Sequence, residues 1–354
     1  MKLSEEIYIG DYKICENSPA YIIAEIGTNH HHGDMEIIKT MVKEAKNSGA
    51  NAVKFQTFIT DELIVRNTRH ASRLNSTLSE GQTWFDLLLS EELTYEKHIE
   101  VANYCKEMSI EFLSTPYDKK SLDFLCDELN VSAIKIASAD LVNHPLLVQC
   151  AKKNRPLIMS TGMSELDDVV EALELIINCG NNDVILMHCT GIYPTNIEDC
   201  NLNVIKLFKE NFNCIVGYSD HCLSNLVPVL AVGLGVKVYE KHFTLSRYMP
   251  GADHRTSIDP KEFSKMVNDI RQTETILGSK KKYVLAGEVE NKSKYNRSLV
   301  ANLDIAKGEK VTEKMLGIKR SGNGLPPKEL FKIIGLRAKV DISKDTTLRM
   351  SMFY

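Results

Sequence analysis

The chain has 354 residues, of which 43% are apolar and 25% are charged, and its formal net charge is −4. These proportions are typical of a folded globular protein and give no reason to expect a nucleic-acid partner. Its longest apolar run is too short to cross a bilayer, and the N-terminus lacks the apolar core of a signal peptide. The nine cysteines include no C-x-x-C pair, which favours a reducing, cytoplasmic setting.

After a predicted hairpin at residues 7–14, the sequence repeats a short buried strand followed by an amphipathic helix. The strands are predicted at residues 21–27, 52–57, 111–116, 133–138, 156–161, 183–189, 215–218 and 236–239. The helices are predicted near residues 35–47, 95–108, 119–129, 145–153, 164–179, 202–211, 226–234 and 260–277. This repeat predicts an α/β fold of the (β/α)8 TIM-barrel type. A doubly wound dinucleotide-binding sheet is disfavoured, because the first βα turn lacks the G-x-G-x-x-G pattern.

The composition changes near residue 278, where charged, loop-like segments begin. We therefore predict a barrel domain with its hairpin at residues 1–282, a linker at 283–293, and a small domain of short strands at 294–354. A domain of that size buries only a modest core, so it is expected to dock on another surface.

Two histidines, His221 and His242, come directly after the seventh and eighth predicted strands. Because a helix connects these strands, a right-handed crossover makes them neighbours and sets the imidazoles side by side at the carboxyl ends. Such a pair can hold a divalent metal and leave most of its coordination sphere open. The alternative is that each histidine hydrogen-bonds to the backbone as an ordinary strand-end residue.

Other polar side chains at the strand ends are expected to converge on the same mouth. Lys54 and Lys135 occupy equivalent places in the second and fourth strands and, with nearby hydroxyls, suit a phosphate or carboxylate. Glu25 is a candidate general base or metal neighbour, or the ion-pair partner of a lysine. Together these residues predict a metal-assisted enzyme acting on a small, phosphorylated anion.

Motifs at these strand ends resemble those of the sialic acid (N-acetylneuraminate, or nonulosonate) synthase family. They lie at residues 24–30, 53–57, 112–116, 135–138, 159–163, 188–195, 218–221, 240–244 and 250–254. Residues 297–299 and 319–324 resemble that family's small C-terminal domain, the antifreeze-like (SAF) domain. The resemblance implies a TIM barrel followed by an SAF domain, in a domain-swapped homodimer.

The implied reaction condenses phosphoenolpyruvate with N-acetylmannosamine, or a related N-acylated sugar, to a nonulosonic acid and phosphate. A divalent cation on His221 and His242, Mn²⁺ foremost and Mg²⁺ or Co²⁺ otherwise, is implied to activate the sugar aldehyde. The implied partners are the two substrates and a second copy of the chain, with no nucleic acid or membrane.

The resemblance also assigns roles residue by residue. The implied phosphoenolpyruvate-binding residues are Lys54, Thr115, Lys135, Ser138, Ser160 and Ser219. The implied sugar-binding residues are Gln56, Tyr193, Asp253 and, from the partner's small domain, Arg320, and the implied catalytic residues are Glu25, Lys135 and Asp140. Three positions depart from the family: Asp140 replaces a glutamate, Gly191 an asparagine and Ser321 a proline.

Three alternatives remain open at this point. The first is a legionaminic or pseudaminic acid synthase that uses a diacetamido-trideoxy hexose, a choice expected to depend on residues 61–92, 191–199 and 251–255. The second is another metal-dependent barrel aldolase, with Lys135 forming a Schiff base. The third is a non-enzymatic module that binds ice or carbohydrate, and the charged side chains of the small domain disfavour ice binding.

Overall fold

The computed structural model describes residues 2–68 and 82–354, so part of the predicted specificity segment at 61–92 lies outside the described residues. The chain divides into two compact units, Met1–Gly278 and Ser279–Tyr354. None of the helices in the described ranges is long and apolar enough to cross a membrane.

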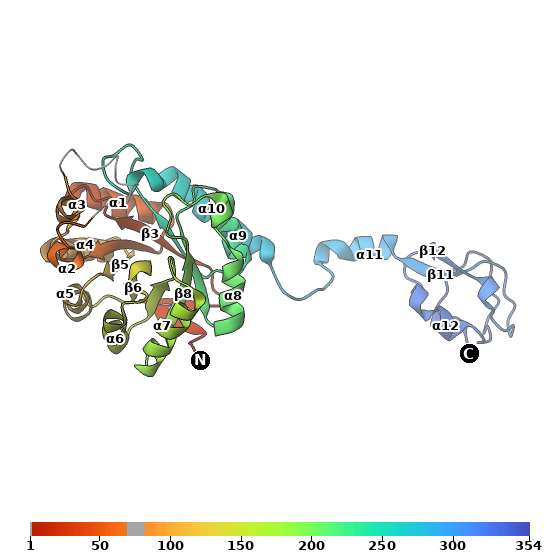
Figure 1. Ribbon diagram of the computed structural model, residues 1–354. Helices are drawn as coiled ribbons and strands as arrows, with labels where there is room; N and C mark the ends of the chain where they lie inside the picture. Colours follow the sequence, from red (N-terminus) through yellow and green to blue (C-terminus); the bar gives the residue numbers. More distant parts are fainter. Residues whose placement is uncertain (1, 69–81) are drawn as a thin grey trace. The chain divides into compact units, whose positions relative to one another are not determined.

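The first unit contains a parallel sheet of eight strands that curls into a nearly closed barrel (Figure 1). The strands are β3 (Tyr21–Gly27), β4 (Ala52–Thr57), β5 (Glu111–Pro116), β6 (Ile134–Ile136), β7 (Leu157–Ser160), β8 (Val184–Cys189), β9 (Ile215–Asp220) and β10 (Val238–His242). Because β3, the first of them, pairs with β10, the last, their spatial order is β5-β4-β3-β10-β9-β8-β7-β6. The predicted TIM-type barrel is confirmed.

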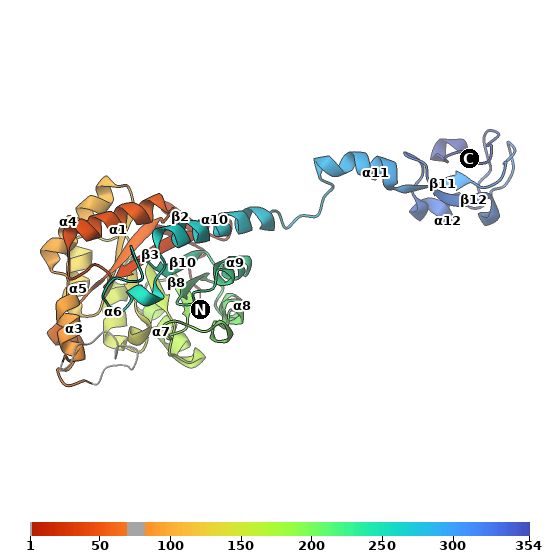
Figure 2. The same ribbon diagram turned by 90° about the horizontal axis from the view of Figure 1, so that it is seen from above.

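Helices surround the strands on the outside (Figures 1 and 2). They are α1 (Met35–Asn47), α4 (Tyr95–Glu107), α5 (Lys119–Asp123) with a π-helical turn at Phe124–Glu128, α6 (His144–Lys152), α7 (Leu166–Asn178), α8 (Asn203–Phe212), α9 (Leu226–Gly233) and α10 (Pro260–Leu277). Two short helices, α2 (Thr60–Leu63) and α3 (Trp84–Glu91), lie in the excursion after β4. Helix α7 begins later than predicted, because the Asp168 carboxylate accepts the backbone N–H of Glu165 at 2.8 Å and fixes the cap there.

Inward-facing side chains form layers because alternate residues of a strand point to one face. The antiparallel hairpin β1 (Glu6–Ile9) and β2 (Tyr12–Cys15) packs with the lowest layer, which is apolar. That cluster contains Ile7, Ile9, Ile14, Tyr21, Ile23, Ala52, Leu113, Ala133, Ile158, Ile185, Met187, Ile215 and Val238. Two residues further along several strands, the inward positions become polar, which places the candidate site above this apolar floor.

Strands β9 and β10 run further than predicted, to Asp220 and His242. Asp220 and Lys241 are therefore strand residues and form a buried ion pair at 2.7 Å on one face of the sheet. Their sequence neighbours Ser219 and Glu240 face the opposite way, into the barrel.

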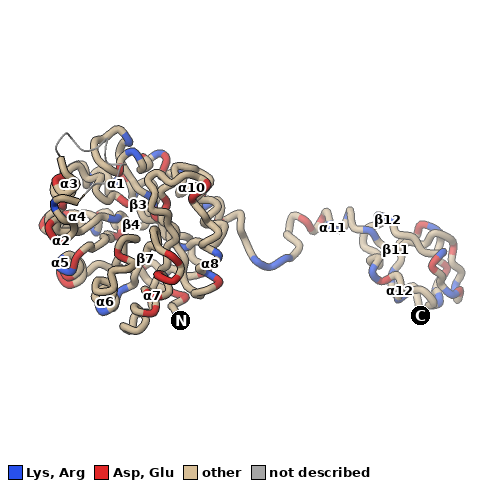
Figure 3. The backbone as a smooth tube through the Cα atoms, viewed as in Figure 1, with Lys and Arg blue, Asp and Glu red and all other residues tan. Residues whose placement is uncertain are grey.

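The second unit has its own small core around strands β11 (Arg297–Ala301) and β12 (Leu316–Arg320), which pair antiparallel. It also contains α11 (Val289–Tyr295) and α12 (Leu330–Ile333), so the predicted linker at 283–293 includes much of a helix. Residues 279–354 contain 17 of the 43 lysines and arginines but only 8 of the 47 acidic residues. The small unit is therefore basic and the barrel acidic. Figure 3 marks where the charged residues lie along the backbone of each unit.

Candidate active site

A buried lysine from β4 lies at the centre of the polar layer. The Nζ atom of Lys54 is 2.6 Å from Oε2 of Glu25 and donates to Oγ1 of Thr115 at 3.2 Å. All three side chains are almost completely buried. Three residues predicted from separate strands are thus in direct contact.

A second lysine, from β6, completes the predicted anion site. Lys135 donates to Oγ of Ser160 at 2.6 Å and to the carbonyl of Ile136 at 3.2 Å. Ser138 accepts the backbone N–H of Gly162 at 3.0 Å, and its hydroxyl lies 3.3 Å from Sγ of Cys189. The arrangement combines two cations with hydroxyl and amide donors, as phosphate and carboxylate groups require.

Glu240 on β10 is a central site residue that the sequence reasoning missed. Its Oε1 atom lies 3.9 Å from Nζ of Lys54 and 4.0 Å from Nζ of Lys135, and it accepts the Ser219 hydroxyl at 3.0 Å. Its Oε2 atom is buried without a hydrogen-bond partner in the described structure. The signal was present, because Glu240 precedes His242 by two residues and must share its face of the strand.

Burial and close pairing shift the pKa values of the two lysines and the two glutamates of this site. Burial raises the pKa of Glu25 despite the opposing effect of Lys54, and burial lowers the pKa of Lys135. For Lys54, burial lowers the pKa but the Glu240 and Glu25 carboxylates outweigh it and raise the pKa. Burial likewise opposes ionisation of Glu240, yet Lys135 and Lys54 hold its pKa below the usual value. Glu240 is therefore the carboxylate that balances the two lysines.

The predicted metal ligands lie together at the mouth, with ring centroids 5.4 Å apart. The Nδ1 atom of His221 is 2.8 Å from the Thr190 carbonyl, so it carries the proton and leaves Nε2 as a lone-pair donor. Burial lowers the pKa of His221 to about 3, which keeps the ring neutral, and the buried Nδ1 of His242 has no hydrogen-bond partner among the described residues. A pair of neighbouring imidazoles, one with a free Nε2 and one whose Nδ1 has no partner among the described residues, fits a divalent cation.

The remaining ligands of such a cation would come from substrate and solvent. In the described ranges, no group of three or more His, Cys, Asp or Glu side chains forms a metal site. The nearest acidic group is Asp253, whose Oδ2 is 3.9 Å from Nδ1 of His242. An open site of this kind suits Lewis-acid chemistry on a bound carbonyl.

The residues predicted to contact the sugar border the same mouth, except Arg320. Gln56 donates to Oε1 of Glu25 at 3.4 Å, and the Tyr193 ring lies 4.0 Å from the His221 ring between centroids. Arg320 lies on β12 in the second unit, over the ring of Tyr295 at 5.4 Å.

Two departures from the family pattern have local structural correlates. Asp140 sits on a short 3-10 turn after β6, where Oδ1 accepts from Asn143 and Oδ2 is buried without a partner in the described structure; burial raises its pKa. At Gly191, an added Cβ would lie 2.8 Å from Cγ of Met163, so this methionine occupies the space of a larger side chain.

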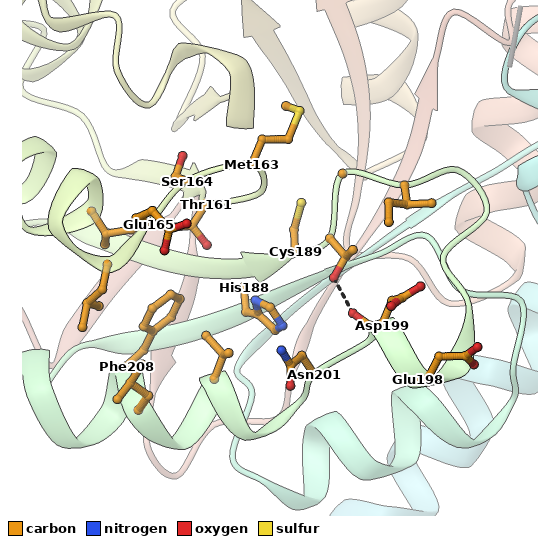
Figure 4. A pocket seen from close by; sticks show the side chains of 17 residues that line it. Thr161, Met163, Ser164, Glu165, His188, Cys189, Glu198, Asp199, Asn201 and Phe208 are labelled. Carbon is orange, nitrogen blue, oxygen red and sulfur yellow. Dashed lines mark hydrogen bonds between the residues drawn. The ribbon is translucent and has the colours of Figure 1, made fainter. Parts of the chain in front are cut away.

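A cavity of about 650 Å³ opens beside the anion site, between the loops that follow β7 and β8 (Figure 4). It shares Thr161, Cys189 and Thr190 with the mouth but contains neither lysine and neither metal-ligand candidate. The hydroxyl of Thr190 donates to the Asp199 carbonyl at 2.9 Å, the bond drawn in Figure 4. The cavity therefore adjoins the candidate site without being part of it.

Comparisons with known proteins identify the family. A profile of the NeuB family matches residues 41–282, and a profile of the SAF domain matches residues 296–353. The chain is 40% identical to N,N'-diacetyllegionaminic acid synthase of Legionella pneumophila, covering 93% of both chains. It is 35% identical to human N-acetylneuraminate-9-phosphate synthase, covering 93% of this chain and 91% of that one.

A solved structure supports the same assignment. The sialic acid synthetase of Leptospira borgpetersenii, crystallised with citrate, superposes with a TM-score of 0.72 at 32% identity, over 82% of this chain and 96% of that one. The chain therefore belongs to the NeuB family of phosphoenolpyruvate-dependent nonulosonate synthases, which are transferases, and carries the family's C-terminal SAF domain.

Proposed function

We propose that this enzyme is an N-acetylneuraminate synthase, which condenses phosphoenolpyruvate with N-acetylmannosamine or a closely related N-acylated sugar. The observation that carries this proposal is the placement of Lys54 and Lys135 around one buried carboxylate, next to the His221–His242 pair. An anion site and an open metal site in one barrel match a reaction between a phosphorylated acid and an aldehyde.

The bond changes assign a task to each part of the site. C3 of phosphoenolpyruvate forms a bond to the sugar aldehyde carbon, whose oxygen takes up a proton. Water then adds to C2, and the C2–O bond to phosphate breaks as the ketone forms, releasing inorganic phosphate. Lys54, Lys135 and the hydroxyls of Thr115, Ser138, Ser160 and Ser219 would hold the phosphate and carboxylate throughout.

Several buried acid–base groups are available for the proton transfers. Burial raises the pKa values of Glu25 and Asp140, which makes both carboxyl groups easier to protonate and suits a role in proton transfer. Enzymes of the family are metal-dependent, and the cation held by His221 and His242, Mn²⁺ foremost, would polarise the sugar aldehyde when bound. Gln56, Tyr193 and Asp253 would position the sugar around this carbonyl.

A second candidate is legionaminic acid synthesis from a diacetamido-trideoxy hexose. Its support is the relative from Legionella pneumophila, which is 40% identical and carries that activity in its name. The two candidates share every residue of the anion and metal sites and differ only in sugar recognition.

A domain-swapped homodimer would bring Arg320 of one subunit to the sugar bound by its partner. Charge supports this proposal, because residues 1–278 contain 26 lysines and arginines against 39 acidic residues, whereas the small unit is basic. Residues 156–205 contain no lysine or arginine at all, so the barrel offers the basic unit an acidic surface beside the mouth. The nine free cysteines support action in the reducing cytoplasm.

The deciding experiment measures phosphate release from phosphoenolpyruvate with Mn²⁺ and a panel of amino sugars, with mass spectrometry of the products. Turnover with N-acetylmannosamine would support the first candidate. Turnover only with a diacetamido-trideoxy hexose would replace it with the second. A folded, metal-loaded enzyme that releases no phosphate with any sugar would contradict both.

A further inference from the structure

Tyr117 is an aromatic residue at the barrel mouth to which neither the motifs nor the family comparison assigned a role. It follows β5 directly, two residues after Thr115, so it continues the inward-facing series that begins with Leu113 and Thr115. Its backbone N–H donates to the Thr57 carbonyl at 3.1 Å, which extends the pairing with β4 past the end of the strand. Tyr117 is therefore held one layer above the lysines.

The side chain of Tyr117 is half-buried, and its ring packs against Phe58. It meets the Phe58 ring edge to face, with centroids 6.2 Å apart and planes at 84°. Four carboxylates from separate segments, those of Glu25, Asp140, Asp253 and Glu240, influence the phenol electrostatically. The hydroxyl makes no hydrogen bond to any residue in the part of the chain that the structure describes.

The charges around Tyr117 indicate which substrate it faces. Burial, reinforced by the four carboxylates, raises the pKa of the phenol, so it stays a neutral donor. Glu25 and Glu240 are paired with the lysines of the layer below, so Asp140 and Asp253 are the carboxylates that disfavour an anion beside the Tyr117 hydroxyl. A neutral, hydroxyl-bearing ligand suits the Tyr117 position better than phosphate or carboxylate does.

We propose that the Tyr117 hydroxyl donates a hydrogen bond to an oxygen of the amino-sugar substrate, and that it is a specificity-determining residue of the reaction. This inference rests on the proposed function and adds a sugar contact that the family motifs did not identify. The packing of the ring against Phe58 provides the rigidity, and the hydroxyl provides the recognition.

Tyr117→Phe tests the proposal, because it removes one oxygen and keeps the ring. With N-acetylmannosamine or the diacetamido-trideoxy hexose, whichever the wild type uses, the KM for the sugar should rise roughly 2- to 13-fold, the loss expected for one neutral hydrogen bond. The KM for phosphoenolpyruvate should stay unchanged. Tyr12→Phe is the matched control, because it removes a phenol that donates to the Pro19 carbonyl in the region of the hairpin.

Sugar analogues that each lack one oxygen-bearing group identify the contact. The wild type should lose affinity for the analogue without the contacted group, while Tyr117→Phe should bind that analogue and the parent sugar equally well. An unchanged sugar KM in a folded Tyr117→Phe enzyme, or an equal rise in both KM values, overturns the inference alone. A wild type that turns over no sugar overturns the proposed function as well.

Discussion

Ser219 on β9 donates its hydroxyl to Oε1 of Glu240 at 3.0 Å, and the two residues are paired across neighbouring parallel strands. The bond orients a buried carboxylate so that the same oxygen lies about equally far from Lys54 and Lys135. Glu240 therefore supplies negative charge to both lysines, in addition to the Glu25 carboxylate that lies 2.6 Å from Lys54. When phosphoenolpyruvate binds, its own negative charges can share this role.

Glu240→Gln should destabilise the enzyme by about 3–5 kcal/mol, because it removes the buried carboxylate beside Lys135 and leaves Lys54 with Glu25 alone. Phosphoenolpyruvate should then raise the melting temperature of the variant more than that of the wild type, since the ligand restores negative charge. Differential scanning fluorimetry with and without phosphoenolpyruvate measures both effects.

The matched control is Glu62→Gln, which breaks an exposed pair with Lys120 and should leave the melting temperature nearly unchanged. An equal response of Glu240→Gln and the wild type to phosphoenolpyruvate would contradict the counter-charge role. Loss of stability in both variants alike would point to a general effect of removing acidic residues.

His221→Ala and His242→Ala should each abolish metal-dependent turnover while leaving the fold intact. For the wild type, Mn²⁺ at 100 times its Kd should stabilise the protein by about 2.7 kcal/mol, because it binds only the folded state. Both substitutions should remove most of this stabilisation, and His144→Ala, which changes a half-exposed histidine on α6, should not. Full activity in either site variant would exclude its residue as a metal ligand.

The sequence predicted the barrel because periodic apolar positions and eight strand–helix repeats are properties of local sequence. It also predicted that Lys54, Thr115, Lys135 and Ser160 converge on one mouth, because each lies within a recognisable strand. It missed Glu240 because β10 was expected to end at Tyr239, which left the glutamate outside the alternation. Membership of an enzyme family also shows that the non-enzymatic alternative was wrong.

Tyr117 shows what sequence patterns do not contain. It lies beyond the last residue of β5, so strand periodicity alone gave no reason to orient its side chain. Its surroundings come from β3, β10 and two loops that are distant in sequence, and only the closed barrel brings their carboxylates together. Charge relationships of this kind depend on tertiary structure.

Protonation of His30 should make the enzyme less stable as the pH falls from about 6.5 to about 4. Burial, with a smaller effect of His98, lowers the pKa of folded His30 to about 4, whereas an unfolded histidine titrates near 6.5. Between these values the unfolded state binds more protons, so acidification favours unfolding, by about 3 kcal/mol when complete.

Denaturant melts from pH 7 to pH 4 measure this dependence. His30→Asn should flatten it, because asparagine can still accept the Gly33 N–H but does not titrate. His144→Asn, at the half-exposed site on α6, should leave the slope unchanged. A slope that His30→Asn leaves intact would assign the acid sensitivity to other groups.

Arg320→Ala should raise the KM for the sugar far more than the KM for phosphoenolpyruvate, because the arginine is proposed to reach only the sugar, from the partner subunit. A mixing experiment tests the domain swap directly. Arg320→Ala and His242→Ala homodimers should each be impaired at both sites, for different reasons. In a hybrid dimer, the Arg320→Ala chain supplies a barrel with both histidines intact. The His242→Ala chain supplies an intact Arg320 to that barrel, so one of the two sites is complete.

Subunit exchange between the two impaired proteins, assayed at a sugar concentration too low for the Arg320→Ala homodimer, should therefore restore as much as a quarter of the wild-type activity, since half of the dimers are hybrids with one working site. If Arg320 instead acted within its own chain, every site in the mixture would carry one defect and no activity would return. Raised salt should weaken the exchange-dependent activity, because it screens the attraction between the basic small unit and the acidic barrel. If mixing restores activity but Arg320→Ala alone leaves the KM for the sugar unchanged, the subunits exchange but Arg320 does not recognise the sugar.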